Sequence, residues 1–235
     1  LGLAQAEIQA GLDELALASG KGSGRIIVGA MPLSRAKLVP QAIAAFHAAN
    51  NVAHISVVDG SHSELLEPLR DGRIDFLIGA IRDQSIGSDL VQEPLFVDRP
   101  MIVARSGHPV FSKPPRRSRS LVSLNKYPWC VPRRGAPLRG KWEQAFTRVG
   151  EPIPDVHVEC GSVLVMRHVL MDTDCLAVLS PDQVSVEVEA GWIETVCPAP
   201  SSLHRTIALT RRRDWRPTSV QQRFLDHLQV LANAR

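Results

Sequence analysis

Hydroxyl and imidazole side chains gather at Ser61, His62 and Ser63, directly after the apolar segment "HISVVDG". A serine next to a histidine could carry out nucleophilic catalysis, provided that a carboxylate orients the histidine. No such carboxylate is evident, so an enzyme is the weakest functional class for this chain. Ser61 and Glu64 also form an S-x-x-E pattern, which is typical of a capping box at the start of a helix. Because the N–H groups at a helix start bind anions and polar groups, this turn favours a helix cap or a ligand contact.

Small and hydroxyl residues recur at four places where an apolar segment gives way to a helical pattern. In an open parallel sheet, ligands bind at the carboxyl ends of the strands, where helix starts present free N–H groups and a positive dipole. Each serine could instead cap its own helix, and capping is the more common role for any one of them. The four turns would converge on one ligand if two lobes faced a common cleft. They are "PLSR" (32–35), "GSHSE" (60–64), "RRGAPLR" (133–139) and "GSV" (161–163).

Other kinds of chemistry are poorly represented. The sequence contains no G-x-S-x-G, H-E-x-x-H or G-x-x-x-x-G-K-[ST] motif, and the glycine cluster "GKGSG" precedes the first apolar strand instead of following it. Cys130, Cys160, Cys175 and Cys197 form no C-x-x-C pair. We therefore expect buried free thiols, with no disulfide framework, metal or other cofactor. Two weaker alternatives are a metal-ligand pair in His157-x-x-Cys160 and a redox pair of Cys160 with Cys175.

The overall charge excludes a protein that coats nucleic acid. The 235 residues include 27 Lys and Arg against 24 Asp and Glu, which leaves a formal net charge of +3. The arginine runs at 116–117 and 211–213 could touch phosphate, but solvated loops explain such runs more often. No apolar run approaches the roughly 18 residues of a membrane span, and the first residues lack the features of a signal peptide. We therefore expect a cytoplasmic protein.

Short apolar segments alternate with amphipathic patterns in the first half of the chain, which predicts a βαβαβ unit and hence an α/β fold. Residues 25–30, 54–60 and 74–81 are predicted to form buried parallel strands. Pro40 must fall in the first turn of the first helix, with an irregular lead-in before it, and Gly72 is expected to stop the second helix. The first helix is expected to bury Leu38, Val39, Ile43 and Phe46.

A second lobe is predicted after the basic, proline-rich loop at 112–120. Strands are expected in "YPWCVP", "DVHVEC" and "CLAVLS", with helices in "LRGKWEQAFTRVG" and "SVLVMRHVLM". A last strand at 206–210 precedes a helix for which Thr218 and Gln221 form a capping box. The helix that Gly150 stops is expected to bury Trp142, Ala145, Phe146 and Val149.

The first residues carry a short heptad pattern with apolar side chains at Leu1, Ile8, Leu12 and Leu15. Two heptads are compatible with a dimer seam, and equally with a single amphipathic helix that lies on its own domain. The following "SGKGSG" is predicted to be a flexible joint.

Four segments resemble the effector-binding region of LysR-type transcriptional regulators, in the order and spacing of that family. The resemblance covers nearly the whole chain and implies a type II periplasmic-binding-protein fold, with two Rossmann-like lobes and a ligand cleft between them. "GAIRD" followed by "DLVQEPLF" is most similar to the galactose-binding-protein regulator branch. The segments are "GRIIVGAMPLSRAKLVPQAIAAFHAAN", "LLEPLRDGRIDFLIGAIRD", "DLVQEPLFVDRPMIVARSGHPV" and "AVLSPDQVSVEVEAGWIETV".

The resemblance also implies a domain organisation. Residues 1–20 would be the end of a linker helix that follows a winged helix-turn-helix, residues 25–101 with 206–235 would form lobe I, and residues 102–205 would form lobe II. The chain would cross between the lobes near 101–105 and 203–206. Thr173-Asp174-Cys175 departs from the family, which often has Gly-x-Gly there.

The resemblance further implies a ligand-sensing regulatory domain without enzymatic activity. Its partners would be a small effector (a sugar, a sugar acid, or an aromatic or other carboxylic acid), promoter DNA through the N-terminal domain, and further copies of the chain in a homodimer or homotetramer, with no membrane. A transport-type solute-binding protein of the same fold is the alternative. By position, the effector site would consist of Leu33, Ser34, Ser61, His62, Arg134, Gly135, Gly161 and Ser162.

Overall fold

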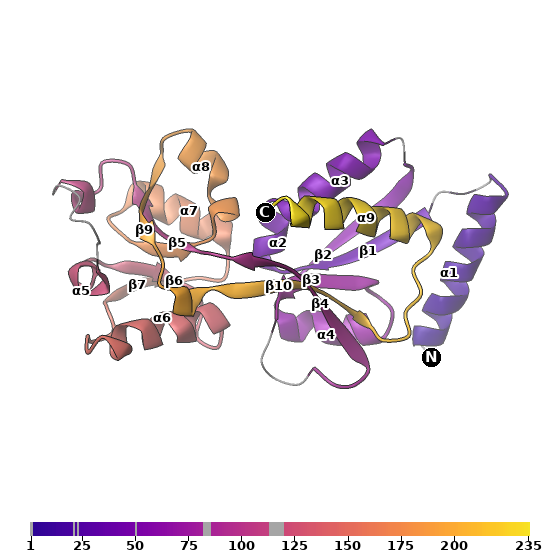
Figure 1. The fold of residues 1–235 in the computed structure, drawn as a ribbon, viewed down its shortest axis with the longest axis horizontal. Coiled ribbons are helices and arrows are strands. Elements are labelled where there is room, and N and C mark those ends of the chain that lie inside the picture. The colour runs from indigo at the N-terminus through magenta and orange to yellow at the C-terminus, as the bar shows by residue number, and fades with distance from the viewer. Residues whose placement is uncertain (1, 21, 23, 50, 82–85, 113–119) are drawn as a thin grey trace. The chain divides into compact units, whose positions relative to one another are not determined.

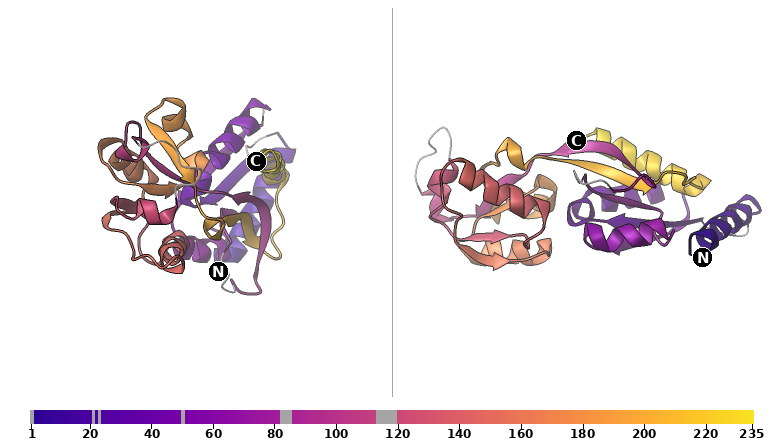
Figure 2. Two further views of the ribbon diagram at one scale, coloured as in Figure 1. Left: turned by 60° about the vertical axis from the view of Figure 1, so that its left-hand side comes forward. Right: turned by 90° about the horizontal axis from the view of Figure 1, so that it is seen from below.

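The computed structural model describes residues 2–20, 22, 24–49, 51–81, 86–112 and 120–235, and the chain divides into two compact units (Figures 1 and 2). Unit 1 comprises Leu1–Val97 and Thr206–Arg235, and unit 2 comprises Asp98–Arg205. Each unit combines helices with β-sheet, which confirms the predicted α/β class. Leu1, Arg82, Asp83 and most of the basic loop expected at 112–120 lie outside the described residues.

Unit 1 is built around a five-stranded sheet with the order β2-β1-β3-β10-β4. β1 pairs in parallel with both β2 and β3, as predicted, whereas β10 runs antiparallel to β3. The strands are β1 (Gly24–Ala30), β2 (Ala53–Asp59), β3 (Phe76–Ala80), β4 (Leu90–Asp98) and β10 (Arg205–Arg212). The helices are α1 (Gly2–Ala18), α2 (Pro32–Ala36), α3 (Leu38–Ala48), α4 (His62–Arg70) and α9 (Ser219–Asn233).

The two faces of this sheet bury separate hydrophobic clusters because successive side chains of a strand point to opposite faces. Ile26 and Val28 of β1 join α3 and α9 in one cluster, which includes Phe46 and Phe224. Ile27 of β1 packs with α4 in the other cluster. The sheet is therefore covered by α3 and α9 on one side and by α4 on the other, as the ribbon also shows (Figure 2).

Two local expectations for unit 1 have clear outcomes. The break at Lys37 separates the short α2 from α3, so Pro40 stands in the first turn of α3, where a missing N–H does no harm. The expectation that 54–60 is a buried strand is wrong, because β2 lies at the edge of the sheet and none of its residues is fully buried. An edge strand has a neighbour on one side only, which its apolar sequence does not reveal.

Unit 2 contains a three-stranded sheet with the order β8-β5-β9 and a two-stranded parallel sheet of β6 and β7. An isolated bridge between Trp129 of β6 and Leu176, the residue before β8, connects the two sheets. The strands are β5 (Met101–Arg105), β6 (Trp129–Val131), β7 (Val156–Glu159), β8 (Ala177–Leu179) and β9 (Ile193–Pro198). The α-helices are α5 (Leu121–Leu124), α6 (Pro137–Arg148), α7 (Val163–Asp172) and α8 (Ser185–Glu189). Short 3-10 turns span Pro109–Phe111, Pro181–Gln183 and Ser201–Leu203.

α6 and α7 cover opposite faces of this strand arrangement. Trp129 of β6 packs with Trp142 and Phe146 of α6, with ring centroids 5.4 to 5.7 Å apart. Cys130, the next residue of β6, points into the cluster under α7. The expectation that Val149 faces inward is wrong, because its side chain is 51% exposed where α6 ends.

The chain passes between the units at β4 and β10, and side-chain hydrogen bonds link these two strands where unit 2 begins. Asp98, the last residue of β4, accepts hydrogen bonds from Nε of Arg205 at 2.7 Å and from Oγ of Ser180 at 2.8 Å. Nη2 of Arg205 donates to the same serine oxygen at 3.0 Å, which closes the ring. The side chain of Asp98 is only 5% exposed and that of Arg205 is 18% exposed, so solvent screens this pair weakly.

We expect Asp98→Ala to lower the free energy of unfolding by about 3 kcal/mol or more, because it leaves a largely buried guanidinium without its counter-charge. Urea unfolding followed by circular dichroism would measure this. The matched control is Glu93→Ala, which removes an ion pair to Arg211 whose carboxylate is 48% exposed and should cost about 0–1 kcal/mol. Equal losses in the two variants would show that the Asp98 pair contributes no more than a surface contact.

Candidate functional site

The strand-to-helix turns of unit 1 lie side by side because β1 and β2 are parallel neighbours in register. Ala30, at the end of β1, is aligned with Asp59, at the end of β2. The chain then enters α2 from the first strand and α4 from the second. An ion pair of 2.8 Å between Nη1 of Arg35 and Oδ2 of Asp59 joins the two turns. Leu33, Ser34, Ser61 and His62 are therefore brought together at one edge of unit 1.

Leu33 and Ser34 belong to the short α2 and are both buried. The hydroxyl of Ser34 has no exposed surface and lies 2.9 Å from the carbonyl oxygens of both Met31 and Ile78. A hydroxyl carries one hydrogen, which these carbonyls share, so a ligand at this turn could only donate to Ser34. This structural role is invisible in the sequence, since the carbonyl of Ile78 comes from a different strand.

Ser61 is the N-cap of α4, and the predicted capping box is confirmed. The backbone N–H of Glu64 donates to Oγ of Ser61 at 3.4 Å, and Oε2 of Glu64 accepts the N–H of Ser61 at 2.7 Å. The hydroxyls of Ser61 and Ser63 lie 3.2 Å apart on the exposed side of the turn. His62 follows as the first residue of the helix and is half-buried. Ser61 thus caps its helix and is also open to solvent.

The corresponding turns of unit 2 follow β6 and β7, which are also parallel neighbours. Glu159, at the end of β7, accepts the backbone N–H of Arg134 at 3.1 Å and Nη1 of Arg139 at 3.0 Å. The N–H of Arg134 first, and then the side chain of Arg139, hold the pKa of the Glu159 carboxyl below its usual value. Arg139 is 3% exposed, pairs also with Glu143 and donates to the carbonyl of Pro132. Its guanidinium is therefore neutralised by residues of unit 2.

Arg134 and Gly135 form the turn before α6, and Gly161 and Ser162 form the turn before α7. Gly135 has a φ of +84°, which favours glycine, and Arg134 is exposed. Oγ of Ser162 accepts the N–H of Val165 at 3.4 Å and so caps α7. These four residues are brought together at one edge of unit 2.

Sequence reasoning missed two residues at this edge. A Cβ built on Gly161 would lie 3.9 Å from Nε of Arg133, so this exposed arginine reaches towards the second turn. The signal was the doubled arginine in "PRRGAP". The half-buried Cys160 stands directly before Gly161, and its Sγ accepts the N–H of Ser162 at 3.2 Å.

The other sulfur and imidazole groups show no metal-binding arrangement. All four cysteines are free, and burial raises the pKa of the Cys130 thiol to about 12. Nε2 of His157 lies 2.9 Å from Oδ2 of Asp155. Within the described part of the chain, no group of three or more His, Cys, Asp or Glu side chains could hold a metal ion. The helices described there also include none long and apolar enough to cross a membrane.

The family model for the LysR substrate binding domain matches residues 19–232. The chain belongs to this family. The HTH-type transcriptional regulator GalR of Pseudomonas putida is 31% identical over 199 residues, which cover 85% of this chain and 49% of GalR. The chain therefore spans about half the length of this relative.

Solved structures of LysR-type effector domains share the two-lobed fold. The regulatory domain of CcmR from Synechocystis, in complex with 2-PG, matches with a TM-score of 0.73 and 17% identity, over 89% of this chain and 98% of that one. The effector-binding domain of QuiR, in complex with shikimate, matches with a TM-score of 0.72 and 14% identity, over 91% of this chain and 99% of that one. These matches confirm the predicted periplasmic-binding-protein-like fold.

We expect an alkylating reagent such as iodoacetamide at pH 8 to modify Cys160 in the folded LysR-family chain well before Cys130. The thiolate is the reacting form, and a thiol with a pKa of about 12 and no exposed surface supplies almost none of it. Peptide mass spectrometry after timed quenching would give both rates. Comparable rates would mean that the cluster under α7 opens to solvent.

Proposed function

We propose that this chain is the effector-sensing part of a bacterial transcription regulator, and that a small polar or anionic metabolite binds at its strand-to-helix turns. Effector binding would control DNA contact through an N-terminal winged helix-turn-helix, as the family likeness implies. In this organisation residues 1–20 are the end of a linker helix, residues 25–101 with 206–235 form lobe I, and residues 102–205 form lobe II. The regulator would act in the cytoplasm.

One observation supports the site most directly. In each unit, two neighbouring parallel strands end at the same edge and lead into helices that have a serine or glycine in the preceding turn or in the first turn of the helix. Helix starts at such an edge present N–H groups and a positive dipole to a ligand. Arg35 in unit 1 and Arg133 and Arg134 in unit 2 stand at these edges. The proposed effector-binding residues are Leu33, Ser34, Ser61, His62, Arg134, Gly135, Gly161 and Ser162.

The arginines favour an effector with a carboxylate or phosphate over a neutral sugar. Arg35 is already paired with Asp59, and Arg139 with two glutamates. By contrast, the described contacts of the Arg133 side chain include no ion pair or hydrogen bond. A sugar acid or an aromatic or other carboxylic acid is therefore our first choice. The solved domain of QuiR is in complex with shikimate, and that of CcmR is in complex with 2-PG.

We propose that the effector is bound without being transformed. GalR, the relative reported above, is named as a transcriptional regulator, which supports a sensor over an enzyme and does not favour a transport-type solute-binding protein.

A thermal-shift screen of sugars, sugar acids and aromatic acids tests the proposal. A ligand present at 100 times its Kd should stabilise the protein by about 2.7 kcal/mol. With a hit in hand, calorimetry should show that Arg134→Ala weakens binding of an anionic effector with little change in Tm. Ser162→Ala should lower affinity by about 0.5–1.5 kcal/mol and also lower Tm through the lost cap of α7.

The matched control for these variants is Arg148→Ala, at the far end of α6 from the turn. It should change neither affinity nor Tm appreciably. If Ser34→Ala, Arg134→Ala and Ser162→Ala all bind as tightly as the unchanged protein, then the effector lies elsewhere and the serines are only structural.

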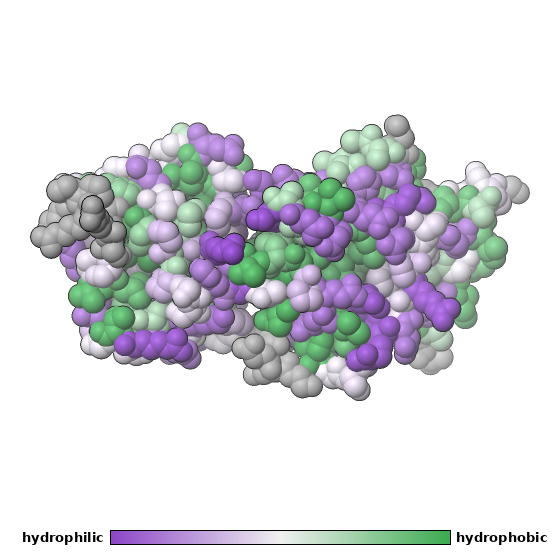
Figure 3. Space-filling model, in the orientation of Figure 1, coloured by the Kyte–Doolittle hydropathy of each residue, from purple (hydrophilic) through white to green (hydrophobic). Residues whose placement is uncertain are grey.

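We also expect the chain to self-associate. Ile8, Leu12 and Leu15 are 66%, 54% and 69% exposed along α1, and this helix buries none of its residues within the described chain. Apolar surface is visible along α1 in the space-filling view (Figure 3). Sedimentation velocity at high micromolar concentration should show dimers or tetramers, and removal of residues 1–20 should weaken the association only partly, because two heptads are too short to hold a dimer alone. A monomer at that concentration would contradict this.

A further inference from the structure

α4 extends from the proposed effector turn towards α1. Its first residue follows Ser61 at the carboxyl end of β2, and its last turn precedes Gly72, beside α1 (Figure 1). The helix is only nine residues long, and Leu65 and Leu69 are buried against the sheet along its length. Pro68 removes one hydrogen bond within the helix, so the path along α4 depends on the packing of Leu65 and Leu69, because close-packed interiors transmit displacement.

The carboxyl end of α4 is held by Arg212, the last residue of β10. Nη1 of Arg212 donates to the carbonyl of Leu69 at 2.6 Å and to that of Ile74 at 3.1 Å. The first of these carbonyls belongs to the last turn of α4, where the backbone lacks partners within the helix. Arg212 is 8% exposed, so these bonds fix the end of the helix against solvent competition.

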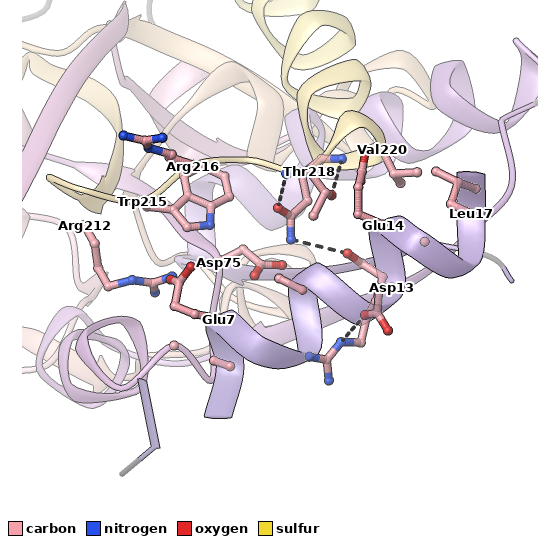
Figure 4. Close-up of a pocket in the computed structure, with 16 residues that line it drawn as sticks. Glu7, Asp13, Glu14, Leu17, Asp75, Arg212, Trp215, Arg216, Thr218 and Val220 are labelled. Atoms are coloured by element: carbon pink, nitrogen blue, oxygen red, sulfur yellow. Dashed lines mark hydrogen bonds and ion pairs between the residues drawn. The ribbon is translucent and has the colours of Figure 1, made fainter. Parts of the chain in front are cut away.

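The same arginine reaches α1. Its Nη2 lies 3.6 Å from Oε1 of Glu7 (Figure 4). Burial lowers the pKa of Arg212, and the charge of Glu7 is the largest effect that opposes this lowering. α1 also lies close to Gly72, two residues after the end of α4, since a Cβ built on Gly72 would lie 2.6 Å from Cβ of Ala6. Arg212 of β10 thus links Leu69 of α4 to Glu7 of α1, and the chain just after α4 lies close to α1 at Gly72.

A second glutamate of α1 touches a different helix. Oε2 of Glu14 accepts the N–H of Ser219, the first residue of α9. Glu7 and Glu14 are two turns apart on one helix, with one linked to α4 through Arg212 and the other to α9. This pair of contacts offers a matched comparison, because only α4 carries a proposed effector turn at its other end.

We propose that α4 is the element that couples the effector turn at Ser61 to α1, with Arg212 as the positioning residue that links the two helices. The inference rests on the proposed function for its biological meaning. A ligand held at the first turn of α4 would displace the helix, and the Arg212 contacts would carry that displacement to Glu7. Because coupling is reciprocal, a change at Glu7 must also alter the first turn of α4.

Hydrogen exchange read by mass spectrometry tests this reciprocity on the 235-residue chain and needs no effector. Glu7→Gln should make the amides of the first turn of α4, residues 62–66, exchange about twofold faster, as expected for loss of a charged pair whose carboxylate is half-exposed. Glu14→Gln should leave these amides unchanged and affect only the start of α9. In the reverse direction, Ser61→Ala should speed exchange in α1 around residues 7–10. Circular dichroism should show the same Tm for Glu7→Gln as for the unchanged chain to within a few degrees.

Two outcomes would overturn the proposal. Faster exchange confined to residues 68–75 in Glu7→Gln would mean that the junction is local and does not reach the effector turn. Equal effects of Glu7→Gln and Glu14→Gln on residues 62–66 would mean that loosening α1 destabilises unit 1 in general. Neither result bears on whether an effector binds, so failure of the coupling and failure of the proposed function are distinguishable.

Discussion

The parallel pairing of neighbouring strands is the constraint on which the candidate site depends. In unit 1 the register of β1 with β2 places Ala30 opposite Asp59, and in unit 2 that of β6 with β7 places Val131 opposite Glu159. Parallel strands end at the same edge, so the helices that follow must begin there as well. Serines and glycines that lie about 27 residues apart in sequence become neighbours only through this pairing. No individual contact at the turns would assemble the site without it.

The local parts of this arrangement could be predicted from the sequence because they depend on residues close together in the chain. The capping boxes of Ser61 with Glu64 and of Thr218 with Gln221 are present as predicted, since both partners lie within one helical turn. The burial of Trp142 and Phe146 follows from their spacing on α6. The four turns were recognised for the same reason.

The remaining features depend on which elements become neighbours, and a single sequence does not state this. The apolar β2 is an edge strand, Val149 is exposed because α6 ends beside it, and Ser34 is buried because the carbonyl of Ile78 arrives from β3. Arg133 was passed over in favour of Arg134 because nothing local shows which of the two reaches towards Gly161. Long-range pairs such as Arg205 with Asp98 are set by the fold as a whole.

The ring of Asp98, Ser180 and Arg205 has a consequence for the order in which the chain can fold during synthesis. Unit 2 is a continuous segment whose first and last residues are joined by this ring, so all of its parts have left the ribosome once Arg205 has emerged. Unit 1 is discontinuous, because β10 lies between β3 and β4 and α9 covers β1. Its sheet cannot close until β10 is made, and its core is not complete until α9 follows. Unit 2 can therefore complete its fold before unit 1, although unit 1 begins earlier in the chain.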